Sequence, residues 1–123
     1  MSTLGIILIS PGHERAHYAL VLATGAAALG REVILFATNA GIRLLLADRA
    51  LEADGREAEV AATGVAGIHD LLEAARDMGV QLRVCEAGRL TEGLAEAPLL
   101  EGTVTAGVVG LLADTLGGQI ITL

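Results

Sequence analysis

The single cysteine, Cys85, is the strongest nucleophile in this sequence of 123 residues. It directly follows the strand-like segment 80–84, and the segment after it has helical character. A thiol at the start of a helix faces unpaired backbone N–H groups and the positive end of the helix dipole, which both favour the thiolate. Arg89 would add positive charge on the same side, whereas the carboxylate of Glu86 opposes it. The sequence therefore predicts a reactive thiol, and a small buried structural cysteine is the alternative.

Three histidines are the other groups that could do chemistry. His13 and His17 have the spacing of two metal ligands on one helix face, but no third ligand accompanies them, so we predict no metal site. His13 is instead expected to line a pocket, and His69 to be solvated on the polar face of its helix. The turn from Ser10 to Gly12 opens a helix and could bind an anion through backbone N–H groups, although most such turns only cap helices.

The composition excludes several functional classes. All eight basic residues are arginines, which removes the Walker phosphate loop and Schiff-base chemistry, because both require a lysine. One cysteine allows neither an intrachain disulfide nor a Cys-x-x-Cys pair, so the sequence favours a reducing, cytoplasmic location. No glycine-rich dinucleotide motif follows the first strand, and we predict no cofactor.

The charge and hydropathy patterns limit the partners. A net charge of −7 with only 2% aromatic residues is unsuited to nucleic-acid binding, which needs basic patches and stacking rings. The longest uncharged stretch, residues 16–30, is shorter than the roughly 20 apolar residues that cross a bilayer, so no membrane span is expected. The chain starts without a basic segment before its apolar run, and we therefore expect no secretory signal.

Short segments rich in apolar or β-branched residues and bounded by turn formers predict strands at residues 4–9, 33–36, 80–84, 102–106 and 119–122. The first runs lack polar alternation, which indicates burial on both faces, as in parallel strands covered by helices. The segments between the runs are long enough for helical crossovers. The fold class is therefore α/β, and residues 1–123 are predicted to form one domain because no change of composition marks a second one.

The clearest predicted helix spans 67–79, where apolar residues recur at helical spacing and Gly79 provides a stop. A second helix is predicted at 15–29, with Ser10 as its N-cap and Pro11 at its first position. Its body is nearly all apolar. We therefore expect this helix to be buried on a second side and to contribute to a subunit interface.

Shorter helices are predicted at 42–47, 86–94 and 107–116. Residues 51–59 are predicted to form an exposed loop or a frayed helix, because acidic groups and the Asp-Gly pair at 54–55 interrupt any apolar pattern. The acidic residues of this region are interpreted as a solvated face: Asp48, Asp54, Glu57 and Glu59.

The loops at the carboxyl ends of parallel strands converge, and ligands bind there in open α/β sheets. This edge would bring Cys85 and Glu86 together with residues that follow the first and second strands. The candidate catalytic residue is Cys85, and the candidate binding residues are Ser10, Gly12, His13, Asn39, Glu86 and Arg89.

Several short motifs carry a family resemblance through their order and spacing: Pro11, Glu14 and Arg15 before an alanine-rich helix, the segment 33–38 with Gly41, Met78 to Val80 before Cys85, and Leu100 to Gly102. Over nearly the whole chain they resemble the DsrE/DsrF-like sulfur-relay family. The resemblance implies a three-layer α/β/α sandwich with a central parallel sheet of about five strands. It also implies a homo-oligomer, often a trimer or a hexamer.

The same resemblance implies that Cys85 accepts sulfur from a donor protein as a persulfide and passes it to an acceptor protein. Some family members carry a second cysteine three residues later, where this chain has Gly88. The alternative function is a non-catalytic homo-oligomeric module that binds a small ligand and in which Cys85 is structural. A thiol peroxidase that is resolved by an outside thiol is a third, more distant hypothesis.

Overall fold

The computed structural model describes residues 2–123 and is built around a five-stranded sheet. All neighbouring strands are parallel, in the order β4-β3-β2-β1-β5. The strands are β1 (Leu4–Leu8), β2 (Val33–Ala37), β3 (Gln81–Cys85), β4 (Val104–Ala106) and β5 (Gln119–Thr122). The predicted α/β class with a parallel sheet of five strands is confirmed. Strand β2 is buried at every position, which is why its sequence shows no polar alternation.

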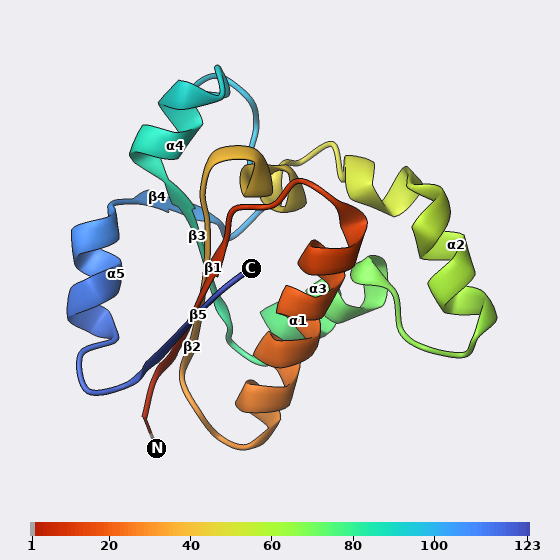
Figure 1. Ribbon diagram of the computed structural model, residues 1–123, viewed down its shortest axis with the longest axis horizontal. Coiled ribbons are helices and arrows are strands. Elements are labelled where there is room, and N and C mark those ends of the chain that lie inside the picture. Colours follow the sequence, from red (N-terminus) through yellow and green to blue (C-terminus); the bar gives the residue numbers. More distant parts are fainter. Residues whose placement is uncertain (1) are drawn as a thin grey trace.

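Helices cover the two faces of the sheet unequally (Figure 1). Helices α1 (His13–Ala28) and α3 (Ile68–Asp77) lie together on one face, and α5 (Val108–Asp114) lies on the other. The chain runs from β1 through β2 and β3 to β4 in one direction across the sheet, then returns from β4 to β5. Since such crossovers are right-handed, the reversed connection places its helix on the opposite face. The result is three layers, the third of which is one short helix.

Two hydrophobic clusters fill the space between these layers. The larger one joins β1, β2 and β3 to α1 and α3, and its fully buried side chains include Leu8, Leu20, Leu35 and Leu72. The smaller one contains Ile34, Phe36 and Leu111, with Ile7 and Cys85 packed against it. Cys85 therefore belongs to the thinly covered face, beneath α5.

The apolar character of α1 is explained partly within the chain. Ala16, Ala19 and Ala23 are completely buried, because small side chains let the helix lie close to the sheet. A second side of α1 packs against α3. Tyr18 and Leu29 remain exposed on this helix, so a role for α1 in a subunit interface stays a prediction.

The predicted start of α1 was wrong. The helix begins at His13 with Gly12 as its N-cap, and no side chain caps it. Ser10 cannot act as the N-cap because its backbone still follows the strand: the Ser10 N–H donates to the Leu123 carbonyl, 3.4 Å away. Pro11 likewise precedes the helix.

The segment that was predicted as a loop or frayed helix over 51–59 is ordered and helical. A 3-10 helix, η2 (Ala50–Ala53), is followed by the α-helix α2 (Gly55–Ala62). The Asp54 carboxylate caps α2 by accepting the Arg56 N–H at 2.8 Å. No residue of helix α2 is fully buried. Because the helix has no buried face, its sequence shows no apolar periodicity from which it could be predicted. The helix predicted at 42–47 is a 3-10 helix, η1 (Asn39–Leu45).

Candidate functional site

Cys85 is both the last residue of β3 and the N-cap of α4 (Glu86–Thr91). Its Sγ accepts a hydrogen bond from the Gly88 backbone N–H at 3.4 Å. The residue is half-buried, so it packs against its neighbours and still keeps part of its surface accessible to solvent. An N–H that points at the sulfur can stabilise negative charge that develops on it during a reaction.

Gly88 allows α4 to lie directly on the loop after β2. A Cβ at this position would lie 2.5 Å from Thr38 Oγ1 and 2.6 Å from the Asn39 backbone nitrogen. Asn39 has a φ of 50° at the start of η1, and its Oδ1 accepts a hydrogen bond from Thr38 Oγ1 at 3.1 Å. The predicted site residue Asn39 thus supports the helix that carries the Gly88 N–H.

An open groove of about 270 Å³ runs beside the thiol. Its lining is mostly apolar, and Glu86 is its one charged residue: Cys85, Glu86, Ala87, Leu90, Gly107 and Val108. Gly107 and Val108 come from the start of α5, so the groove lies between α4 and α5. A larger cavity of about 440 Å³ lies beside Val80 and Leu82, towards the opposite end of β3. It lacks a nucleophile, so the groove at Cys85 is the candidate site.

Arg89 lies beside this groove, but its guanidinium is used for structure. Nε donates to the Leu94 carbonyl at 2.9 Å, Nη2 to the Ala97 carbonyl at 2.7 Å, and Nη1 to Thr105 Oγ1 at 3.1 Å. These bonds hold the chain after α4 against β4. The structure shows no hydrogen bond from the described Arg89 atoms to Cys85, so the expected charge assistance is not a direct contact.

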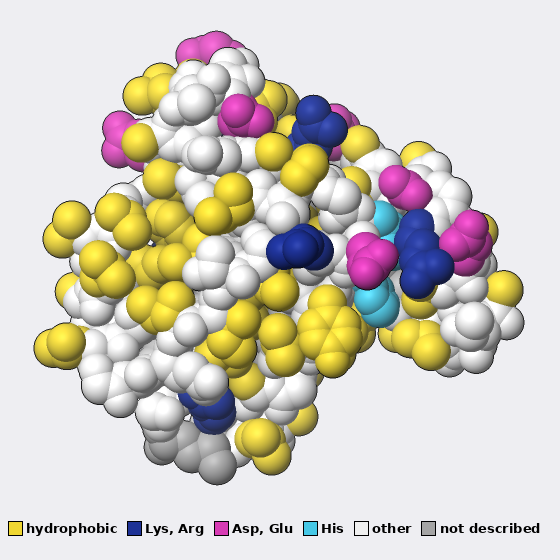
Figure 2. All heavy atoms as spheres, in the orientation of Figure 1, with side chains coloured by type: hydrophobic (Ala, Val, Ile, Leu, Met, Phe, Trp, Pro, Cys, Tyr) yellow, Lys and Arg dark blue, Asp and Glu magenta, His cyan; other side chains and the backbone are white. Residues whose placement is uncertain are grey.

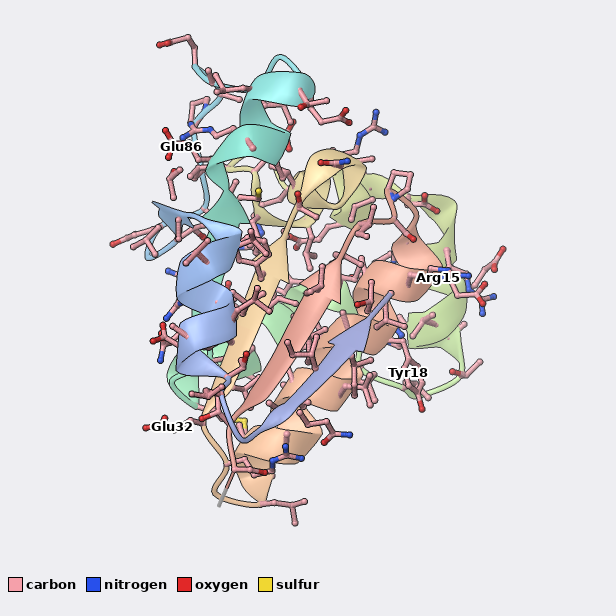
Figure 3. All side chains as sticks on the ribbon, turned by 60° about the vertical axis from the view of Figure 1, so that its left-hand side comes forward. Arg15, Tyr18, Glu32 and Glu86 are labelled. Carbon is pink, nitrogen blue, oxygen red and sulfur yellow. The ribbon has the colours of Figure 1, made fainter. Side chains whose placement is uncertain are left out.

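The residues that follow β1 are not brought to Cys85. His13 lines a separate pocket of about 240 Å³ with Glu14, His17 and Arg56, between α1 and α2. Figure 3 shows Glu86 and Arg15 on opposite sides of the sheet. The expected convergence of Ser10, Gly12 and His13 with the thiol is wrong. Strand β2 separates β1 from β3, and α1 leads away over the other face.

His13 is a buried structural residue, 3% exposed at its side chain. Its Nε2 lies 2.7 Å from Glu57 Oε1, while its ring and that of His17 stack with centroids 5.8 Å apart. His17 Nε2 lies 2.8 Å from the Ala66 carbonyl. Within residues 2–123, no group of three or more potential ligands is arranged to hold a metal ion.

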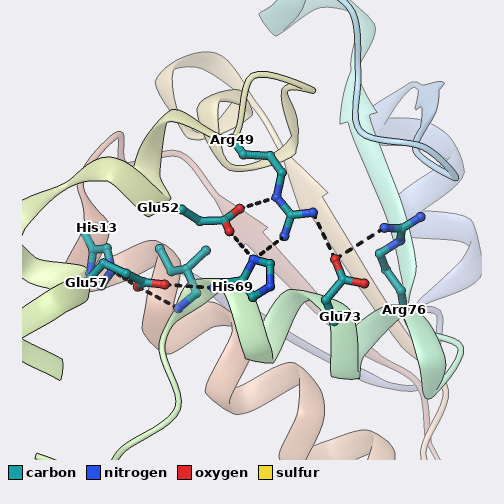
Figure 4. A network of polar contacts seen from close by, with 8 residues as sticks. His13, Arg49, Glu52, Glu57, His69, Glu73 and Arg76 are labelled. Carbon is teal, nitrogen blue, oxygen red and sulfur yellow. Dashed lines mark hydrogen bonds and ion pairs between the residues drawn. The ribbon is translucent and has the colours of Figure 1, made fainter. Parts of the chain in front are cut away.

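Glu57 was predicted to lie on a solvated face, and this prediction was wrong. Its carboxylate accepts the backbone N–H groups of Ile68 at 2.9 Å and His69 at 3.0 Å, and thereby caps α3 (Figure 4). Gly67 makes room for it, since a Cβ there would lie 2.7 Å from the carboxylate. Glu57 is therefore a half-buried residue that connects α1, α2 and α3. The residues around Glu57 in the sequence do not indicate this role, because its histidine partner is 44 residues away.

The Glu57 carboxyl should make the free energy of unfolding depend on pH. Burial alone would raise the pKa of its carboxyl, but hydrogen bonds from the His69 N–H, the His13 ring and the Ile68 N–H outweigh burial and lower the pKa. A carboxyl with a lowered pKa stabilises the fold above its ordinary pKa, and this contribution is lost as pH falls through the lowered value. We expect Glu57→Gln to reduce the free energy of unfolding at neutral pH by about 1–3 kcal/mol.

Urea unfolding followed by circular dichroism across the acid range measures this effect. The loss should shrink as the pH falls, because the wild-type carboxyl becomes protonated as well. Glu59→Gln is the matched control, since Glu59 is 67% exposed and forms only a surface pair with Arg56. Equal losses for the two variants would contradict the capping role of Glu57.

A second polar network joins η2 to α3 (Figure 4). The Arg49 guanidinium contacts Glu52, and its Nη1 donates to Glu73 Oε1 at 3.0 Å. His69 Nδ1 contacts both Glu52 and Arg49. The prediction that His69 is merely solvated was wrong, although its side chain is 59% exposed. Hydrogen bonding to Arg49 holds the pKa of Glu73 below its ordinary value.

Comparisons with known proteins agree with this fold. The DsrE/DsrF-like family model matches residues 3–119. Similar solved structures include the ychN protein from E. coli, with a TM-score of 0.75 and 20% identity over 100% of both chains. The protein of unknown function MTH1491 from Methanobacterium thermoautotrophicum matches with a TM-score of 0.63 and 17% identity, again over 100% of both chains.

A further similar structure, BT1422 from Bacteroides thetaiotaomicron, is also described as a conserved protein of unknown function. Its TM-score is 0.61 at 12% identity, over 99% of this chain and 95% of that one. No protein of curated function matches the sequence significantly. Among residues 2–123, no helix combines the length and apolarity needed to cross a membrane. The match over residues 3–119 shows that this chain belongs to the DsrE/DsrF-like family.

Proposed function

We propose that this protein is a sulfur carrier that holds a sulfane sulfur on Cys85 and transfers it from a donor protein to an acceptor protein. The observation that carries the proposal is the hydrogen bond from the Gly88 N–H to Cys85 Sγ at the edge of an open groove. A thiolate in this position is stabilised and remains within reach of a second thiol. Family membership supports the same chemistry, and homo-oligomerisation as a trimer or hexamer is part of the proposal.

Sulfur transfer at Cys85 needs no cofactor and no net oxidation. The Cys85 thiolate attacks the outer sulfur of the donor persulfide, the sulfur–sulfur bond of the donor breaks, and the donor leaves as a thiolate. An acceptor thiolate then attacks the outer sulfur now carried by Cys85. That bond breaks in turn, and Cys85 returns to its thiolate. Because the chain has one cysteine, the carried sulfur can leave only to another molecule.

Intact-mass measurement after incubation with a persulfide donor tests the proposal. The wild-type protein should gain one sulfur atom, which a small thiol then removes, and Cys85→Ser should gain none. Glu86→Gln is the matched control, because it changes the neighbouring side chain and keeps the thiol. An unchanged wild-type mass would contradict the proposal. A thiol that reacts only after denaturation would instead indicate a structural cysteine and a non-catalytic binding module.

A further inference from the structure

The pocket of about 240 Å³ between α1 and α2 has no part in the proposed sulfur chemistry, and it shares no lining residue with the groove of Cys85. Figure 2 shows histidine, carboxylate and arginine side chains gathered side by side over α1 and α2. The lining combines these polar groups with two apolar side chains, Val60 and Val65. A concave site with an apolar part and a few polar groups is the common form of a small-molecule site.

His13 contributes a buried ring nitrogen that lacks a partner. Its Nε2 lies 2.7 Å from Glu57 Oε1, and the same carboxylate accepts two backbone N–H groups, so it is an ionised acceptor and Nε2 carries a proton. In the neutral ring Nδ1 is then an acceptor. Nδ1 is shielded from solvent, and no described group donates a hydrogen bond to it. Because a buried acceptor without a donor is costly, a ligand that supplies an N–H or O–H group would be favoured here.

His17 repeats this arrangement one turn later on α1. Its Nε2 lies 2.8 Å from the Ala66 carbonyl, which can only accept, so Nε2 again carries the proton and Nδ1 is again an acceptor. The two rings stack with their planes 13° apart, and both line the pocket. The two histidines therefore add acceptors to the pocket, not donors.

The charged side chains around the pocket favour a cation. Glu14 and Glu59 both line it, and Arg56, the one arginine among its described lining residues, is paired with Glu59 through Nη1 at 3.1 Å. Acceptors and negative charge thus exceed the available donors. Histidines and carboxylates are also metal ligands, but in the described part of the chain no three of them are arranged to hold a metal ion. An organic cation therefore fits this pocket better than a metal.

We propose that this pocket binds a protonated primary amine with a short apolar body. The ammonium group has three N–H donors, which satisfy His13 Nδ1 and the carboxylate of Glu14, while the apolar body packs against Val60 and Val65. The side chains of α2 on the outer wall turn aside to admit the amine at little cost in packing, because no residue of α2 is fully buried. The site acts independently of the sulfur chemistry at Cys85.

Proton–nitrogen NMR titration of the full chain tests the binding. The probe is isoamylamine, and its analogues isoamyl alcohol and isocaproate have similar apolar bodies with no charge and a negative charge. The amine should shift the backbone signals of the pocket residues in a saturable way and should move the Nδ1 signal of His13, which reports the loss of a free lone pair. Isoamyl alcohol should bind roughly tenfold more weakly, because its hydrogen bonds are not charge-assisted. Isocaproate should cause no saturable shift.

Two variants locate the site. Glu14→Gln should weaken isoamylamine binding about tenfold, because it removes a charged acceptor, and His13→Gln should weaken it as well. Glu32→Gln is the matched control, since Glu32 is exposed and Figure 3 places it at the opposite end of the molecule from Arg15 on α1. It should bind the amine like the wild type. If His13→Gln fails to fold by circular dichroism, Glu14→Gln decides the outcome.

Three results would overturn the amine site. No saturable shift with isoamylamine would mean that water satisfies His13 Nδ1. Equal affinities for the amine and for isocaproate, or for wild type and Glu14→Gln, would show that charge does not select the ligand. Tight binding of zinc chloride that displaces the amine would make the pocket a metal site instead. Each result can be obtained whether or not Cys85 takes up sulfur, so failure of the amine site is distinguishable from failure of the proposed function.

Discussion

Replacing Gly41 by alanine is expected to lower the free energy of unfolding by roughly 3–5 kcal/mol. A Cβ at Gly41 would overlap the Leu8 carbonyl oxygen and lie 2.6 Å from the Leu8 carbonyl carbon. That carbonyl already accepts the Thr38 N–H at 2.9 Å. To relieve the clash, η1 would have to move away from the ends of β1 and β2. Both are interior strands of the sheet.

Urea unfolding followed by circular dichroism measures this loss. Gly25→Ala is the matched control, because Gly25 lies within α1, is exposed, and has no atom within 4 Å of a Cβ placed there. Alanine has the higher helix propensity, so this control should gain roughly 0.5–1 kcal/mol. Similar stabilities for wild type and Gly41→Ala would show that η1 does not approach β1 as closely as described.

Replacing Gly88 by alanine is expected to damage the candidate site as well as the fold. The added methyl group would press on Thr38 and on the Asn39 backbone, which would push α4 away from the loop after β2. Overpacking of this kind costs about 1–3 kcal/mol of stability. The Gly88 N–H would also move from Cys85 Sγ, and losing a hydrogen bond to a charged atom should slow the native thiol reaction by about an order of magnitude.

The rate of reaction with a thiol reagent, measured at neutral pH on the folded protein, checks the second effect. Gly25→Ala should leave that rate unchanged, because the same substitution is made far from the groove. A Gly88→Ala protein that loses stability but reacts at the wild-type rate would mean that the N–H does not activate the thiol. The hydrogen bond to Cys85 would then be only a helix cap.

Local patterns predicted the framework well. The residues of β2 are apolar without interruption and are buried throughout, because a central parallel strand meets a helical layer or a neighbouring strand on every side. The helix predicted at 67–79 was found as α3, since its apolar residues recur at the helical period and face the sheet. The position of Cys85 at the end of β3 followed from the same reasoning.

Contacts between distant segments were not predictable. The spacing of charges around Glu57 indicated a solvated face, but folding brings α2 to the start of α3, where Glu57 supplies the cap that Gly67 cannot. Arg89 was placed correctly on α4 and assigned to the thiol. Its actual partners are carbonyl groups of the following loop, whose path has no periodic signal.

The sequence by itself determined the parallel α/β framework and the place of Cys85 where a strand meets a helix, because burial and periodicity are properties of neighbouring residues. Only the tertiary structure decided which strand ends share a site. Strand β2 separates β1 from β3, and the crossover directions send α1 and α5 to opposite faces. His13 is therefore kept from Cys85, while Val108 is brought to it. The thin cover that α5 gives to its face of the sheet likewise follows from strand order, which no local pattern encodes.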